Sequence, residues 1–186
     1  IYLEEFKALG EVVVTTDDGS YGFKGNAIEY LNNNEVLFTG TPCQIAGLNS
    51  YLNKPYDNLY TVELFCGGIP SPYSWESYID DYFKRDEIRY VQFRYKYEGW
   101  WKFGLRIQLL HDDYYYSMRE MKDPFTTSYL KNYNVNNMCF DCKYKANKKN
   151  ADFTIGDAWN INRIRKNMDD NRGITSVIIN SHKGKE

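Results

Sequence analysis

Short apolar runs alternate with helical patterns through the first half of the chain. β-Branched and aromatic runs predict strands, and apolar residues three or four positions apart predict a helix after each of them. The predicted strand–helix pairs are residues 10–16 with 25–33, 35–39 with 42–52, and 59–65 with 71–83. Strand, short turn and helix in repetition are typical of βαβ units with a parallel sheet.

The pattern changes beyond residue 86, where strands predominate. The predicted elements are strands at 88–95, 103–110, 114–118, 151–155 and 174–180, and a helix at 122–131. His111-Asp112-Asp113 joins two of these strands as a hairpin. We therefore predict a mixed α/β (α+β) fold, with βαβ units first and a mixed sheet with a hairpin in the second half.

The length and composition narrow the classes of protein. A chain of 186 residues suits one domain, predicted over residues 1–186, and 42% hydrophobic residues exclude wholesale disorder. A net charge of −2 argues against a dedicated nucleic-acid binder, and no apolar run approaches the length of a membrane span. Because the chain starts at Ile1 without a Met, we expect a piece excised from a longer protein.

Common catalytic and nucleotide-binding patterns are missing. The histidines, His111 and His182, fall in a predicted turn and a charged tail, so no Ser or Cys nucleophile has an obvious histidine partner. Neither the GxxxxGK(S/T) nor the GxGxxG phosphate loop occurs. No catalytic residue is assigned.

The four cysteines carry the strongest chemical signal. Cys139 and Cys142 form a C-x-x-C pair that can reach one metal from a tight turn, and Cys43 and Cys66 each follow a predicted buried strand. Carboxyl ends of parallel strands share one edge of a sheet, so we predict one tetrahedral site. The alternatives are two disulfides, which a reducing cytosol disfavours, or unrelated thiols beside a lone C-x-x-C.

The identity of the metal is open between two choices. Four thiolates suit a [4Fe–4S] cluster or structural zinc. We favour a cluster, because the predicted site lies at the edge where α/β sheets usually bind ligands. We also expect a cytoplasmic protein. Zinc and empty thiols remain alternatives.

Several charged and aromatic residues are candidates for holding an anionic cofactor. Arg94 and Lys96 alternate along a predicted strand and so share one face. Asp157 and Trp159 follow the strand that ends near Gly156, where the indole could cover a cofactor. The alternatives are an exposed strand face and a packing tryptophan.

A basic stretch follows the C-x-x-C directly. It consists of Lys143, Lys145, Lys148 and Lys149. These cations could hold cofactor phosphates or offset cluster charge, and the alternative is a solvated surface.

Several blocks together resemble a known family. They are residues 40–48 (GTPCQIAGL), 64–72 (LFCGGIPSP), 93–96 (FRYK), 139–145 (CFDCKYK), 151–159 (ADFTIGDAW) and 170–173 (DNRG). From about residue 35 to the end, they resemble the C-terminal domain of the coenzyme F420 hydrogenase/dehydrogenase β-subunit family.

The resemblance implies an iron–sulfur flavoprotein. Members pass electrons between a [4Fe–4S] cluster, FAD and a soluble hydride carrier such as the deazaflavin coenzyme, and FAD rests on the resemblance alone. The cluster ligands would be the four cysteines, with Thr41 and Gln44 beside the first of them among the cofactor-binding residues. Expected partners are a redox protein or an upstream ferredoxin-type domain, with neither nucleic acid nor membrane; assembly into a homo-oligomer is left open.

This sequence departs from the family pattern at several positions. Gly67 stands where the family usually has a histidine, Tyr95 replaces an Asp, and Asn160 replaces a Gly; residues 136–138 replace Arg-Pro-Ser. These changes put the deazaflavin substrate, and also tight binding of a flavin, in question. The expectation is an electron-transfer oxidoreductase module, and the rival is a zinc-stabilised, non-catalytic scaffold or interaction domain, connected with surface-polysaccharide synthesis.

Overall fold

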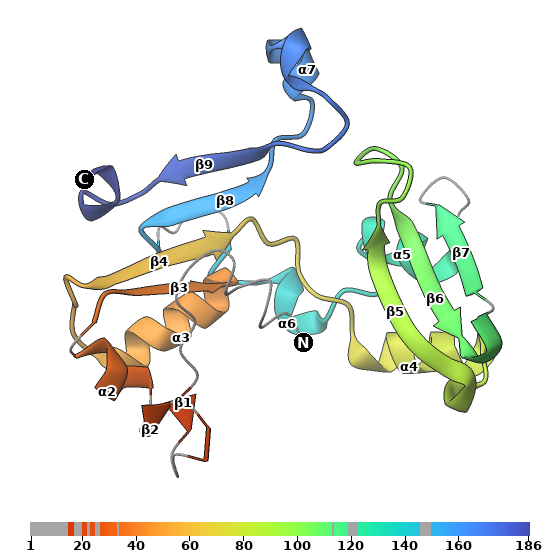
Figure 1. Ribbon diagram of the computed structural model, residues 1–186, viewed down its shortest axis with the longest axis horizontal. Coiled ribbons are helices and arrows are strands. Elements are labelled where there is room, and N and C mark those ends of the chain that lie inside the picture. The colour runs from red at the N-terminus through yellow and green to blue at the C-terminus, as the bar shows by residue number, and fades with distance from the viewer. Residues whose placement is uncertain are drawn as a thin grey trace. The chain divides into compact units, whose positions relative to one another are not determined.

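A computed structural model describes residues 15–16, 20–21, 23–24, 27–32, 34–112, 114–118, 123–145 and 150–186 (Figure 1). The chain divides into two compact units. The first contains the described residues of Ile1–Glu63, Lys149–Thr154 and Ile179–Glu186, and the second those of Leu64–Lys148 and Ile155–Ile178. Within the described ranges, no helix is long and apolar enough to cross a membrane.

The elements alternate along the chain as the sequence predicts. The helices are α2 (Ala27–Leu31), α3 (Pro42–Leu52), α4 (Pro72–Tyr82), α5 (Pro124–Leu130), α6 (Asn137–Phe140) and α7 (Ile161–Ile164). The strands are β1 (Thr15–Thr16), β2 (Phe23–Lys24), β3 (Val36–Gly40), β4 (Leu59–Leu64), β5 (Ile88–Tyr95), β6 (Gly104–Leu109), β7 (Tyr114–Met118), β8 (Phe153–Asp157) and β9 (Thr175–Ile179).

A four-stranded sheet has the order β3-β4-β8-β9. Strands β3 and β4 are parallel, with Val36 opposite Leu59 and Gly40 opposite Glu63, which confirms the predicted βαβ arrangement. Strands β8 and β9 extend this sheet, whereas the sequence pattern predicts a mixed sheet within the second half. The second-half sheet, β5-β6-β7, is purely antiparallel.

Helix α3 contributes buried apolar side chains to the core of the first unit. Pro42 fits its first turn because the missing N–H has no helical partner there, and Asn53 ends it in the left-handed conformation (φ 52°). Ile45 and Leu52 are buried as predicted, and Leu52 packs with Leu31 and Leu59. In Figure 1, α3 runs alongside β3 and β4.

A buried polar group, here called the Asp152 network, connects β4 with the C-terminal residues of the first unit. The Asp152 carboxylate accepts hydrogen bonds from the Thr61 N–H (2.9 Å), the Thr61 hydroxyl (3.0 Å) and the Ser181 hydroxyl (2.6 Å). Lys183 Nζ lies 3.5 Å from the same carboxylate. Burial opposes the ionisation of Asp152, but the hydrogen bonds and Lys183 outweigh it and lower its pKa.

The second unit packs α4 and α5 against the antiparallel sheet. Strands β6 and β7 form the predicted hairpin, and His111 turns the chain with φ 66°. The buried core consists of Tyr78, Ile79, Leu105, Ile107 and Phe125. This core is strongly aromatic.

One buried carboxylate organises the polar atoms of that core. Asp123 accepts hydrogen bonds from the hydroxyls of Tyr78 (2.7 Å) and Tyr115 (3.0 Å), and from the N–H of Thr126 (2.7 Å) as the N-cap of α5. Burial, followed by the hydrogen bond to Asp123, raises the pKa of Tyr78. The phenol therefore stays protonated and acts as a permanent donor.

Most predicted elements are confirmed, with small shifts at their ends. The predicted strand at residues 88–95 has the bounds of β5, and of the predicted strand at residues 10–16 only Thr15–Thr16 lies among the described residues, as β1. Helices α6 and α7 are absent from the sequence-based prediction. Each has four residues, too few to show a helical period.

Candidate functional site

The second unit contains an apolar pocket of about 470 Å³. It is lined by Pro70, Ser71, Pro72, Trp75, Phe93, Arg94, Phe103, Phe125, Thr126, Tyr129, Leu130 and Trp159. Pockets of this size lined by aromatic side chains with few polar groups are typical sites for organic ligands.

Aromatic rings from separate elements form the wall of this pocket. Trp75 of α4 meets Phe93 of β5 and Phe125 of α5 edge to face, with ring centroids 4.8 and 4.9 Å apart. This is a favoured geometry for aromatic pairs. Phe93 is 52% and Trp159 45% exposed, so both rings are open to solvent and to a ligand.

Among the described residues that line the pocket, Arg94 is the one cation. Its guanidinium lies over the rings of Phe103 (4.9 Å) and Trp100 (5.0 Å) and forms an ion pair with Asp157 at 3.1 Å. The structure thus brings together two predicted cofactor-binding residues that are 63 positions apart. Because ring faces and a carboxylate hold it on several sides, the guanidinium has a defined direction.

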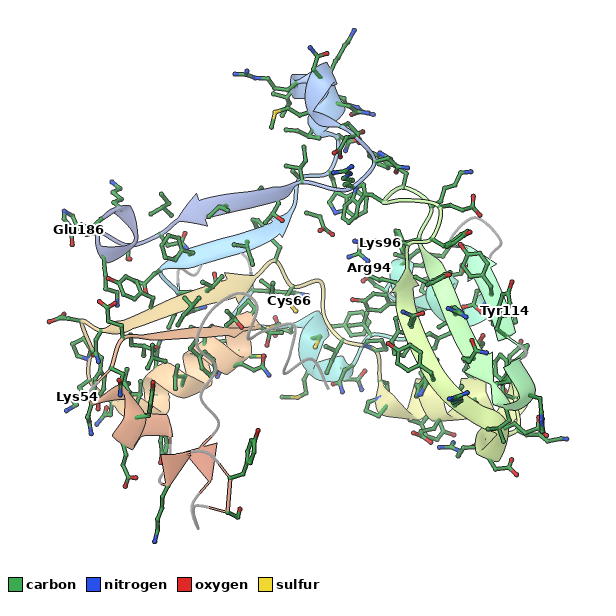
Figure 2. The ribbon with its side chains drawn as sticks, viewed as in Figure 1. Lys54, Cys66, Arg94, Lys96, Tyr114 and Glu186 are labelled. Atoms are coloured by element: carbon green, nitrogen blue, oxygen red, sulfur yellow. The ribbon has the colours of Figure 1, made fainter. Side chains whose placement is uncertain are left out.

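Lys96 and Trp159 join the same cluster through Trp100. Lys96 Nζ lies 4.3 Å from the Trp100 ring, and Figure 2 shows Lys96 beside Arg94 at the end of β5. Burial and then the charge of Arg94 lower the pKa of Lys96, with Asp157 acting in the opposite direction. Trp159 stacks on Trp100 with centroids 4.9 Å apart.

Gly173 allows this stack to form. Its φ of +90° favours glycine, and a β-carbon there would lie 2.9 Å from the Trp100 ring. The DNRG block of the sequence therefore has a packing reason at this position.

Three of the four cysteines belong to the second unit. The loop after Cys66 is held against the segment before Cys139 by a bridge between Pro70 and Val135 and by the Asn136 N–H donating to the Ile69 carbonyl (2.8 Å). A β-carbon at Gly68, whose φ is +112°, would lie 3.0 Å from Cβ of Cys139. Glycine is therefore needed for this close approach.

Tyr129 connects these cysteines with the pocket. Its ring lines the pocket, and its hydroxyl donates to the Gly68 carbonyl at 2.9 Å. Burial, and then the electrostatic influence of Cys66 and Cys139, raises the pKa of Tyr129. One phenol thus faces both the cysteine loop and the aromatic pocket.

The shared metal site of four cysteines is not confirmed. All four are free thiols, and among the described residues no three His, Cys, Asp or Glu side chains lie close enough together to hold a metal ion. Cys43 belongs to the first unit. Gly40 of β3 lies opposite Glu63 of β4, and Cys43 and Cys66 each come three residues later in the chain. Both cysteines therefore follow parallel strands, as the sequence predicts. The ligand set stays a prediction.

The other predicted site residues have local partners. The Thr41 N–H donates to Gln44 Oε1 (2.8 Å), and the Thr41 hydroxyl lies 3.2 Å from Cys43 Sγ, so both residues serve the start of α3. Lys145 donates to the Cys139 carbonyl at 2.7 Å, and Lys143 lies over the Tyr144 ring at 5.3 Å. Contact of these four residues with a cofactor stays a prediction.

The remaining two lysines of the predicted basic stretch, Lys148 and Lys149, lie outside the described residues.

The sequence-based prediction missed most of the pocket. Trp75, Phe103, Phe125 and Tyr129 come from α4, the β5–β6 connection and α5, and no local motif joins them. Their aromatic character was visible in the sequence, but only the fold brings the rings together.

Comparison with known proteins adds a family match and two partial relatives. The family described as the C terminus of the beta subunit of coenzyme F420 hydrogenase/dehydrogenase matches residues 33–186. The electron transfer subunits of dihydroorotate dehydrogenase B (NAD(+)) from two strains of Streptococcus pneumoniae are 40% identical over 55 residues, which is 29% of this chain. The chain covers 22% of the length of each.

Proposed function

Since the chain belongs to the family formed by the C terminus of the coenzyme F420 hydrogenase/dehydrogenase β-subunit, we propose that it is an electron-transfer module that combines an iron–sulfur cluster with a flavin. The names of the family and of its partial relatives support oxidoreductase electron transfer in general. The cofactors and the residues that hold them are our proposal. A hydride-carrying small molecule would be its substrate, and a redox protein or upstream domain its partner.

The position of Tyr129 is the observation that carries this proposal. Its ring lines the aromatic pocket, and its hydroxyl bonds the loop of Cys66. A ring bound in the pocket and a metal centre on the cysteine loop would lie on two sides of one side chain. That proximity is what electron transfer between two cofactors requires.

The chemistry of the thiols fits a cluster. Cys66, Cys139 and Cys142 are half-buried and form no disulfide. Backbone hydrogen bonds already hold the loop after Cys66 against the segment before Cys139. Cys43 is the fourth ligand that the sequence predicts. The four thiols do not form a preassembled site, so the binding of a cluster would have to bring them together. Small metal-binding domains whose folding is coupled to metal binding assemble their sites in this way. A cluster supplies single-electron transfer.

The aromatic pocket fits the ring of a flavin. Its walls are apolar rings suited to a flat heteroaromatic ring, and Arg94 provides the cation for the electron-rich carbonyl edge. A flavin exchanges electrons singly or in pairs and so connects a cluster with a hydride carrier. The chain's own part is to bind the ring, keep water away from its face and orient its polar edge.

Anaerobic purification followed by iron, acid-labile sulfide, zinc and flavin analysis tests the proposal. We expect iron and sulfide in equal amounts, and we expect Cys142→Ser to lose most of both. A colourless protein with stoichiometric zinc and no sulfide would instead establish the scaffold. Full iron content in Cys142→Ser would remove that cysteine from the ligand set.

A pair of arginine variants tests the flavin part. Arg94→Ala is expected to weaken flavin binding about tenfold or more, because a charge-assisted hydrogen bond is lost. Arg89→Ala is the matched control, since Arg89 is exposed on the same strand and does not line the pocket. Equal flavin affinity in the two variants would contradict the assignment of the pocket.

A further inference from the structure

We propose that a basic surface on the second unit docks an acidic electron-transfer protein. This basic patch consists of Arg163, Ile164, Arg165, Lys166 and Met168, in α7 and the turn Lys166–Met168 that follows it. The sequence-based prediction did not single it out. The inference rests on the proposed function and names the chemistry of its protein partner.

The charge of the patch is uncompensated. Arg163, Arg165 and Lys166 are exposed, and in the described part of the chain none has a carboxylate within ion-pair distance. These three cations fall within four consecutive residues of a chain whose net charge is −2. A complementary surface must therefore be acidic.

The acidic residues that follow the patch already have other partners. Asp169 accepts a hydrogen bond from the Trp101 indole N–H at 3.0 Å. Asp170 lies 3.6 Å from the Arg172 guanidinium. Neither carboxylate neutralises the three cations.

One exposed apolar side chain, Ile164, lies between these cations in the sequence, and a second, Met168, follows them. Ile164 is 80% exposed and Met168 is 46% exposed. Apolar side chains surrounded by a polar, charged rim are the usual composition of a protein–protein contact.

An open hollow adjoins the patch, and its tryptophan lies near a tryptophan of the aromatic pocket. Trp101, Asn160, Asn162, Arg163 and Lys166 line this hollow. The Trp101 ring lies 6.1 Å from that of Trp159, which stacks on Trp100 and also lines the aromatic pocket. A protein docked on the patch would thus lie beside Trp101, one ring away from Trp159 of the proposed flavin site.

These features match the physics of electron-transfer encounters. Such complexes have small interfaces and associate quickly through complementary charge, because the partners must also separate quickly. A compact patch of three cations with one protruding isoleucine suits this kind of contact better than a large permanent interface.

Binding to an acidic plant-type [2Fe–2S] ferredoxin, used as the probe, tests the inference on the cofactor-loaded protein. We expect Arg163→Glu/Arg165→Glu/Lys166→Glu to raise Kd about tenfold or more, and wild-type affinity to fall steeply with added salt. Ile164→Ser should raise Kd by a smaller factor with an unchanged salt dependence. The matched control, Arg89→Glu/Lys131→Glu/Lys185→Glu, makes the same change in net charge at exposed positions elsewhere and should keep Kd within about twofold.

The inference would be overturned by no binding of ferredoxin at low ionic strength, by an equal loss in the control, or by tighter binding to single-stranded DNA or anionic vesicles than to ferredoxin. Iron, sulfide and flavin are measured on the same samples. Missing cofactors count against the proposed function, whereas unchanged ferredoxin binding by a cofactor-loaded triple variant counts against the docking surface alone.

Discussion

The two units of this chain are stabilised by different kinds of interior. In the first, the Asp152 network joins β4 to the C-terminal residues through hydrogen bonds to one carboxylate. In the second, aromatic rings of α4, α5 and β5 pack edge to face or tilted, including Trp75, Phe93 and Phe125. Each unit also buries one hydrogen-bonded carboxylate, Asp152 or Asp123, so the difference lies in the apolar part: leucines form the buried cluster of the first unit, and aromatic rings make up much of the second.

The difference explains where the organic ligand is proposed to bind. Hydrogen-bonded groups must lie at fixed distances from one another, and the hollow beside Asp152 is lined by polar side chains such as Asn49, Asn180 and Lys183. Rigid rings packed at an angle leave a space with apolar walls between them, which is the aromatic pocket. We therefore expect the stability of the second unit to depend on the volume of its buried rings, and that of the first to depend on pH.

The largest effect is expected from Phe125→Ala. Phe125 is buried against Trp75, Tyr78 and Phe93, so truncation removes ring contacts and leaves a cavity. We expect the free energy of unfolding to fall by about 3–5 kcal/mol, measured by urea titration. Tyr73→Ala, at an 80% exposed ring, should change it by less than about 0.5 kcal/mol. A similar, small loss in both variants would show that the rings do not stabilise the second unit.

A smaller effect, dependent on pH, is expected from Asp152→Asn. The folded pKa of Asp152 lies below its ordinary value of 3.8, so the carboxylate stabilises the fold above that pH and loses this contribution as pH falls through the folded pKa. The variant should lose about 2 kcal/mol at pH 7, and the difference from wild type should shrink near pH 3. Urea titrations at both pH values measure this.

Asp170→Asn is the control for that experiment, since Asp170 is exposed. Its unfolding free energy should stay close to wild type at both pH values. A difference between Asp152→Asn and wild type that is the same at pH 3 and pH 7 would mean that the network does not act through the ionised carboxylate.

The smallest change in stability is expected from Tyr129→Phe. It removes only the hydroxyl that donates to the Gly68 carbonyl, and should lower the unfolding free energy by about 1 kcal/mol. Because this bond holds the Cys66 loop, iron content should fall while flavin affinity changes little. A variant that loses flavin but keeps its full iron content would show that Tyr129 serves the pocket and not the Cys66 loop. Tyr133→Phe, at an exposed ring, is the control.

The fold was predictable where local pattern decides it. Strand β5 and helix α3 follow from β-branched runs and from the spacing of Ile45 and Leu52. The membership of β8 and β9 in the first sheet was not predictable, because strand order depends on contacts between distant segments. The four-residue α6 depends on its Asn136 cap, a signal too short to stand out.

The candidate site was predictable in part for the same reason. Arg94, Asp157 and Trp159 were found because each stands in a recognisable block, and the structure places the first two in one ion pair. Phe103 and Phe125 look like ordinary core residues in the sequence. Phe103 lies beside Arg94 because β6 pairs with β5, and Phe125 lines the same pocket because α5 packs on the sheet.

The location of the tryptophans has a spectroscopic consequence. All four, Trp75, Trp100, Trp101 and Trp159, belong to the second unit, and the first has none. Indole emission therefore reports the unfolding of the second unit alone, whereas circular dichroism averages over both. Coincident transitions by the two probes would mean that two dissimilar interiors melt as one cooperative body, and separated transitions would measure how far they are independent.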